Sequence, residues 1–275
     1  MIIVPMLSLF VFSFTSVRVG FRNFRFVGLS NYWALLTDTD FVSAISVTLI
    51  LLAFSVFLQM VLGIVYALII HKTKIFVGFI RLVMMFPMVV SPIIVGIIWR
   101  TMIMPNFGGI ELVLASLGLP GLPDMLSDPW RARSLIILAT TWQWTPFVIL
   151  YILAGLEGMS VSPFESAKID GANWFQEIIY LTLPMLSKII VVVLIFRIIE
   201  SMKVFPLIFA LTQGGPGRAT QDLTYLVYQS GFRYLRLGYA SAVSMFLLAL
   251  AITAIVVLGL VTQTKNTKVR RNDET

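Results

Sequence analysis

The sequence contains no cysteine, and His71 is its single histidine among 275 residues. Without cysteine the chain cannot form disulfides, thiolate metal sites or a cysteine nucleophile. Metal sites usually need several converging histidine, cysteine or carboxylate groups, so His71 is expected at an interface rather than on a metal. The phosphate-binding pattern G-x-x-x-x-G-K-[ST] is also missing. We therefore expect no metal, no cofactor bound by this chain and no enzymatic activity of its own.

Charge is scarce as well. Charged residues make up 12% of the chain and hydrophobic residues 59%, whereas about a quarter of an ordinary soluble domain is charged. Runs without Asp, Glu, Lys or Arg cover residues 1–17, 41–70, 82–99, 134–156 and 237–264. About 20 helical residues cross a bilayer core, and the alternating segments of about 10 residues typical of a β-barrel do not occur. The predicted fold class is an all-α integral membrane protein.

We predict one membrane domain over residues 1–275 with six spans, at about 2–17, 42–70, 78–104, 134–156, 187–211 and 239–262. The first is short and begins near Pro5, which fits either a short helix or a chain whose beginning is missing. An even number of spans puts both termini on one side. Basic residues in the tail (263–275) and in the 71–81 turn favour the cytoplasmic side.

A polar, helix-forming loop, residues 157–186, separates the fourth and fifth predicted spans. Ser162 followed by Pro163 and Glu165 predicts a capping box that starts a short helix. Asp170-Gly171 should end this helix, because glycine adopts turn conformations at little cost. A second helix is expected from about Ala172 to Tyr180. Composition alone leaves two interpretations, an interfacial hairpin that stabilises the bundle and a docking surface for a partner.

Residues 165–184 resemble the signature E-A-A-x-x-x-G-x9-I-x-L-P of the permease subunits of ATP-binding-cassette importers. Glu165, Ala167, Gly171 and the Leu-Pro ending at Pro184 agree with it, whereas Ser166 replaces the first Ala and Leu181 the Ile. In that family the segment inserts into a cleft of a cytoplasmic ATPase subunit and transmits its closure to the membrane helices. The resemblance implies a coupling role for Glu165, Ser166, Ala167, Asp170, Gly171, Ala172 and Pro184.

Two further segments resemble carbohydrate-type permeases of the maltose, trehalose and glycerol-3-phosphate kind, residues 211–216 (Leu-Thr-Gln-Gly-Gly-Pro) and 26–32 (Phe-Val-Gly-Leu-Ser-Asn-Tyr). One departure is Phe205-Pro206, where the family often has Phe-Asp. The resemblance implies a type I importer with alternating access. Its implied partners are a second homologous permease, two copies of an ATPase subunit that bind ATP and Mg, an external solute-binding protein, a sugar-like solute and membrane lipid. No nucleic acid partner is expected.

Polar and aromatic residues within two predicted spans are candidates for the solute pathway. They are Thr140, Gln143, Trp144 and Phe147 on the fourth span, and Arg197, Glu200 and Ser201 on the fifth. Charges within spans usually face the bundle interior or a wet cavity. Arg197, Glu200 and Lys203 are spaced three apart and can pair with one another. An internally neutralised structural triad and aromatic packing at the membrane interface remain open alternatives for these two groups.

From composition alone, a secondary transporter or channel that works without an ATPase is the main alternative function. Such proteins need no docking hairpin and often show inverted repeats. A membrane enzyme is disfavoured because the sequence offers no convincing Ser/His/carboxylate constellation. The resemblance favours the importer permease, located in the cell membrane with both termini in the cytoplasm.

Overall fold

The structure is a computed structural model that describes residues 3–17, 25–73 and 77–272. In these ranges the chain is helical apart from its connections and one isolated β-bridge between Thr15 and Phe26, so the all-α prediction is confirmed for the described residues. The helices are α1 (Ile3–Ser13), α2 (Ser30–Thr37), α3 (Thr39–Lys72), α4 (Val77–Val89), α5 (Pro92–Met102), α6 (Gly109–Ser116), α7 (Pro129–Glu157), α8 (Ser162–Ile169), α9 (Trp174–Gln176), η1 (Glu177–Thr182), α10 (Leu183–Ser201), α11 (Phe205–Leu211), α12 (Leu223–Tyr228), η2 (Gln229–Arg233) and α13 (Leu237–Asn272).

Four helices among the described residues are long and apolar enough to cross a membrane: α3, α7, the segment Trp174–Ser201 and the part of α13 from Leu237 to Leu260. The first two begin at aspartate caps. Asp38 accepts a hydrogen bond from the Asp40 amide, and Asp128 accepts from the amides of Trp130 and Arg131. These caps satisfy amides that have no partner inside the helix. α1 is shorter, with 11 residues, and packs against α13.

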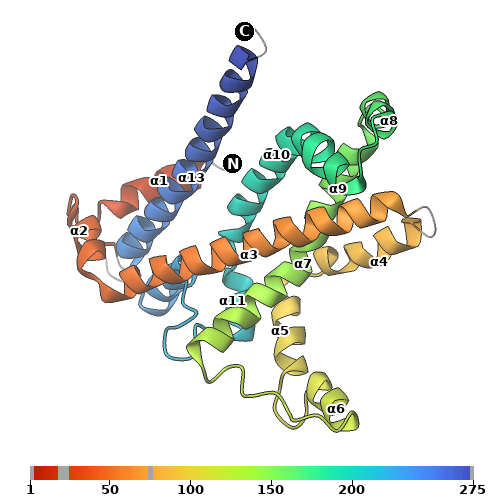
Figure 1. The fold of residues 1–275 in the computed structure, drawn as a ribbon. Helices are drawn as coiled ribbons and strands as arrows, with labels where there is room; N and C mark the ends of the chain where they lie inside the picture. The colour runs from red at the N-terminus through yellow and green to blue at the C-terminus, as the bar shows by residue number, and fades with distance from the viewer. Residues whose placement is uncertain (1–2, 18–24, 74–76, 273–275) are drawn as a thin grey trace.

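The third predicted span, 78–104, is not one continuous helix. α4 and α5 meet at an angle of 101° across the two-residue break at Val90 and Ser91. Pro87 lies inside α4 and Pro92 starts α5. A proline removes a backbone donor and clashes with the preceding turn, which explains why the helix breaks here. α5 consequently turns away from α4 and packs against α11 (Figure 1).

The fifth predicted span, 187–211, also differs. One helical segment runs from Trp174 to Ser201, through the π-helical turn η1 that directly precedes α10. The expected separate helix over 172–180 is thus the first part of this segment. Pro184 lies in the first turn of α10, so the i→i+5 pattern of η1 ends where proline removes a donor. A second break at 202–204 then separates α10 from α11, which carries Pro206 in its first turn.

The core forms where α3 crosses α7. Val56, Met60, Val148 and Ile152 are buried in a cluster that also takes in residues of α10. The helices approach closely at Gly63, where a Cβ atom would lie 2.4 Å from Val148 Cγ1. In Figure 1, α8 and the C-terminal end of α13 lie toward one end of the molecule, and α6 lies at the opposite end.

Candidate functional site

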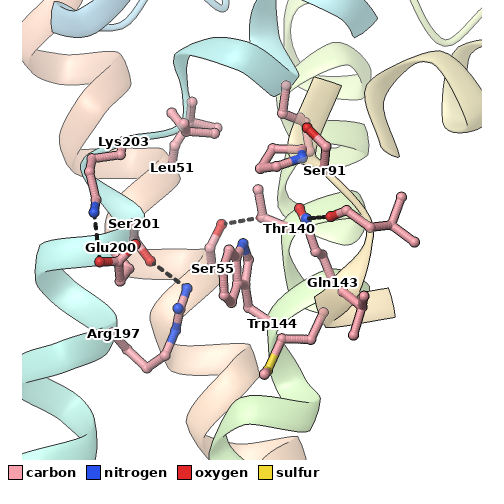
Figure 2. Close-up of a pocket in the computed structure, with 16 residues that line it drawn as sticks. Leu51, Ser55, Ser91, Thr140, Gln143, Trp144, Arg197, Glu200, Ser201 and Lys203 are labelled. Atoms are coloured by element: carbon pink, nitrogen blue, oxygen red, sulfur yellow. Dashed lines mark hydrogen bonds and ion pairs between the residues drawn. The ribbon is translucent and has the colours of Figure 1, made fainter. Parts of the chain in front are cut away.

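A cavity of about 370 Å³ lies at the middle of the helix bundle, where α3, α7 and α10 meet the two helix breaks (Figure 2). Val90 and Ser91 come from the break between α4 and α5, and Lys203 and Val204 from the break between α10 and α11. Six of the seven predicted pathway residues line it. The cavity is lined by Leu51, Ser55, Met88, Val89, Val90, Ser91, Pro92, Thr140, Gln143, Trp144, Arg197, Glu200, Ser201, Lys203, Val204 and Leu207.

Arg197 is the central polar residue of this cavity and is only 1% exposed. Its Nε donates to Gln59 Oε1 at 2.9 Å, and its Nη2 donates to Ser201 Oγ at 3.1 Å. The guanidinium lies over the Trp144 ring, 4.8 Å from the ring centroid. The face of an aromatic ring attracts a cation, so this contact helps to hold a charge that lies inside the membrane domain.

The triad of Arg197, Glu200 and Lys203, one of the two alternatives for this group, forms only in part. Glu200 and Lys203 pair at 2.6 Å, and both side chains are partly exposed. Arg197 instead turns toward α3, because Gln59 offers it a buried acceptor there. Phe147 does not line the cavity, but its ring lies 5.7 Å from the Arg197 guanidinium.

Two polar residues of α3 support the site and were not among the sequence-predicted candidates: Ser55 lines the cavity, and Gln59 bonds to the lining residues Thr140 and Arg197. The hydroxyls of Ser55 and Thr140 are 3.0 Å apart, and Gln59 Nε2 donates to the Thr140 carbonyl at 3.2 Å. Ser55 and Gln59 are both buried, and both lie within the long apolar helix α3. An amide in an otherwise apolar span is costly unless it is bonded, so Gln59 was a signal available in the sequence.

Gln143 reaches the break between α4 and α5. Its Nε2 donates to the Val90 carbonyl at 2.8 Å. Its Oε1 and the Nη1 of Arg197 are buried without a hydrogen-bond partner among the residues that the structure describes. Among the described residues, Gln143 and Arg197 thus each line the cavity and also hold a buried polar atom without a partner, and Trp144 supplies an aromatic ring to the same wall.

The second candidate site is the hairpin formed by α8 and α9. The predicted stop at Asp170-Gly171 is confirmed, since α8 ends at Ile169 and Gly171 has φ +79°. That conformation favours glycine because other residues clash there. The predicted capping box at Ser162 is wrong, because Val161 occupies the N-cap position and no side-chain cap bond is present.

A capping box does occur farther along the chain, at Asn173 before the start of α9. Asn173 Oδ1 accepts from the Gln176 amide at 3.0 Å, and Gln176 Oε1 accepts from the Asn173 amide at 2.8 Å. The sequence Asn-x-x-Gln carries this signal. Trp174, the next residue, has Lys72 of α3 over its ring at 4.3 Å. Local bonds thus fix the shape of the hairpin, and Lys72 connects it to the end of α3.

The hairpin has a largely exposed surface. Glu165, Ser166, Asp170 and Gly171 are exposed, and Ala167 and Ala172 are half-buried. Ile169 is 87% exposed at the tip. A hollow of about 360 Å³ is lined by Ala167, Asp170, Gly171, Ala172, Gln176, Glu177, Tyr180 and Leu181. Pro184 is exposed but does not line this hollow. Six of the seven predicted coupling residues therefore lie together on the hairpin.

The loop that follows α11 packs tightly against α12. Tyr225 Oη donates to the Gln213 carbonyl at 2.7 Å, and the Thr212 and Thr220 hydroxyls are 2.8 Å apart. Asp222 caps α12 by accepting from the Tyr225 amide at 2.8 Å. Burial raises the pKa of the Asp222 carboxyl to about 6, because burial disfavours the charged form. This region is held together by its own hydrogen bonds and contributes no side chain to the cavity wall.

Comparison with known proteins places the chain among transport proteins. Residues 59–266 match the family model described as the inner membrane component of binding-protein-dependent transport systems. The chain is 37% identical over 243 residues to the probable ABC transporter permease protein y4oQ of Sinorhizobium fredii, covering 88% of this chain and 78% of that protein. It is 34% identical over 259 residues to the trehalose/maltose transport system permease protein MalF of Thermococcus litoralis, covering 92% and 86%.

A solved structure has the same fold. It is the crystal structure of a bacterial ABC transporter involved in the import of the acidic polysaccharide alginate, matched with a TM-score of 0.82. The match covers 95% of this chain and 89% of that chain at 24% identity. The chain therefore shares its overall fold with a chain of that ABC transporter.

Proposed function

The chain belongs to the family of inner membrane components of binding-protein-dependent transport systems, and we propose that it is the permease subunit of an ATP-driven importer for a sugar or sugar-like solute. The observation that carries the solute class is the central cavity. Gln143, Ser201 and Thr140 supply hydroxyl and amide groups beside the Trp144 ring. Sugars present hydroxyls around an apolar ring face, and a few placed polar groups with an aromatic plane suit them. The trehalose/maltose relative supports the same class.

The proposed mechanism is alternating access. The α8–α9 hairpin would lie in the cytoplasm and dock in a cleft of an ATPase subunit, with Glu165 making polar contact, Ala167 allowing close approach and Gly171 making the bend. Closure of the ATPase subunits, driven by the ATP that they bind with Mg, would push the hairpins together and open the cavity outward. Trp174–Ser201 is one helical segment. A displacement of the hairpin would therefore be transmitted along this helix to Arg197 and Ser201.

The assembly would contain this chain, a second homologous permease, two copies of the ATPase subunit and an external solute-binding protein. Six membrane spans are proposed, with α1 as the first and the bent pair of α4 and α5 as the third. Both termini would then lie in the cytoplasm of a cell-membrane protein. The position of α8 and the end of α13 toward the same end of the molecule supports this orientation.

Reconstitution tests the proposal. The chain is co-expressed with its neighbouring permease and ATPase genes, and ATP hydrolysis is measured in liposomes with binding protein loaded with trehalose, maltose or sn-glycerol 3-phosphate. We expect the ATPase to co-purify and at least one solute to stimulate hydrolysis. In a variant carrying Gln143→Leu and Ser201→Ala, the order of preference among the solutes should change while the ATPase still co-purifies. Solute uptake by the purified chain with no ATPase bound would instead support a secondary transporter or channel.

A further inference from the structure

The bend between α4 and α5 joins two helices that pack mainly against different neighbours. α4 packs against α7, whereas α5 packs mainly against α11 and makes a smaller contact with α7 that includes Trp99 and Trp142. The contact of α5 with α11 is close at Gly96, where a Cβ atom would lie 2.7 Å from Ala210 Cβ. Pro87 and Pro92, on either side of the bend, supply no backbone donors. The angle at the bend therefore depends on contacts from outside the two helices.

Gln143 makes such a contact. It lies on α7, is 1% exposed and donates from Nε2 to the Val90 carbonyl within the bend. The orientation of its amide is fixed by chemistry, because only the nitrogen of the amide can donate to a carbonyl oxygen. In this orientation Oε1 is left buried and finds no hydrogen-bond partner in the described part of the chain.

An amide in this position is unfavourable for packing alone. A buried acceptor without a partner carries the full desolvation cost of that group, and an apolar side chain of similar size would avoid it. What the glutamine provides in return is an N–H group that donates to the Val90 carbonyl. We propose that Gln143 is a positioning residue that holds the bend between α4 and α5 against α7, and thereby sets the position of the cavity wall at Val90 and Ser91.

The lack of native cysteine allows a direct test of this role. Cysteines introduced at Phe86 and Ile97, which are 66% and 52% exposed on either side of the bend, carry spin labels for a distance measurement by electron resonance. The purified protein is compared with the variants Gln143→Met, which keeps the length but has no N–H, and Gln143→Asn, which is too short to reach Val90. Both should show a second distance whose population rises about tenfold, the change that one lost hydrogen bond typically produces.

Thr140→Val is the matched control. Thr140 lies on the same helix and lines the same cavity, but its hydroxyl faces Ser55 rather than the bend, so the label distance should stay as in the parent. Equal distance distributions in the parent, Gln143→Met and Gln143→Asn would overturn the proposal, as would an equal change in Thr140→Val. Should Gln143→Met fail to fold, Gln143→Asn decides, because it keeps a polar group at the site.

The consequence for transport rests on the proposed function. In the reconstituted assembly, the Gln143 variants that lose the hydrogen bond to Val90 should move less trehalose or maltose per ATP hydrolysed. The association with the ATPase should stay unchanged. The label distance is measured without solute or ATP. An assembly without ATP-driven uptake in the parent would therefore count against the proposed function alone, and an unchanged distance against the role of Gln143 alone.

Discussion

The cavity wall and the α8–α9 hairpin are both rich in polar groups, but they are built in opposite ways. In the wall, hydrogen bonds join residues that are far apart in sequence, 138 positions for Arg197 and Gln59 and 85 for Ser55 and Thr140. In the hairpin, the capping box joins residues only 3 positions apart. Short-range bonds form from local sequence, whereas the wall exists only once the helices have packed.

The cavity wall and the hairpin also differ in how deeply their side chains are buried. Arg197 is almost fully enclosed, whereas Ile169 at the hairpin tip is among the most exposed hydrophobic residues. A substitution in the wall leaves buried polar partners unsatisfied and should therefore lower stability. A substitution in the hairpin leaves the bundle intact and should act on the contact with a partner. The following variants test whether the two regions separate in this way.

The largest effect is expected for Arg197→Met. The variant removes two hydrogen bonds made by a charged group and leaves Gln59 Oε1 buried without its donor. We expect the free energy of unfolding to fall by about 1.5–3 kcal/mol, the range for bonds to charged groups, measured by thermal unfolding in detergent. Arg197→Lys keeps the charge but not the planar fork, and should recover only part of the loss. Unchanged stability in Arg197→Met would contradict the central role of this side chain.

An intermediate effect, confined to the hairpin, is expected for Gly171→Leu. At φ +79° a side chain costs about 1–2 kcal/mol locally, which should distort the turn while the bundle unfolds at the normal temperature. If the hairpin couples to an ATPase, membrane levels stay normal and ATP-driven uptake is lost. Gly158→Leu serves as control, because Gly158 is exposed, and a Cβ atom there makes only ordinary contacts, with its nearest neighbour, the Ala154 carbonyl oxygen, at 3.5 Å. Normal uptake in Gly171→Leu would refute the docking assignment.

The smallest effect is expected for Asn173→Ala. Losing the cap should destabilise the start of α9 by about 1 kcal/mol, seen as faster amide hydrogen exchange over residues 174–178. Ser162→Ala provides the contrast, since Ser162 looks like a cap in the sequence but makes no cap bond in the structure. Exchange in α8 should not change in that variant. Faster exchange in Ser162→Ala than in Asn173→Ala would reverse the assignment of the two caps.

Much of the fold was predictable from local signals. Uncharged runs located α3, α7 and α13, because charges are costly inside a bilayer. Gly171 correctly marked the end of α8, since the turn needs a left-handed backbone. Pro87 and Pro92 indicated a kink, but not the 101° angle between α4 and α5, because a proline weakens a helix and its neighbours decide the direction in which it bends.

The candidate site was predictable in its residues but not in their pairing. Six of the seven pathway candidates line the cavity, since polar and aromatic groups within spans gather where the bundle is wet or bonded. The sequence left open a pairing of Arg197 with Glu200 and Lys203 on its own helix. In the structure Arg197 bonds to Gln59 of α3 and to Ser201 of α10. Helical spacing shows only which residues share a face of the helix. In the structure Glu200 forms its ion pair with Lys203.

The sequence by itself determined that this protein is a bundle of apolar helices with a polar hairpin between two of them, because hydropathy and turn chemistry act over a few residues. Only the tertiary structure decided that two helix breaks meet at one cavity. It also decided that Arg197 of α10 bonds to Gln59 of α3, and that Gln143 of α7 bonds to Val90 in the break between α4 and α5. Those contacts join distant parts of the chain, and a buried polar group takes whichever partner the packed helices place within reach.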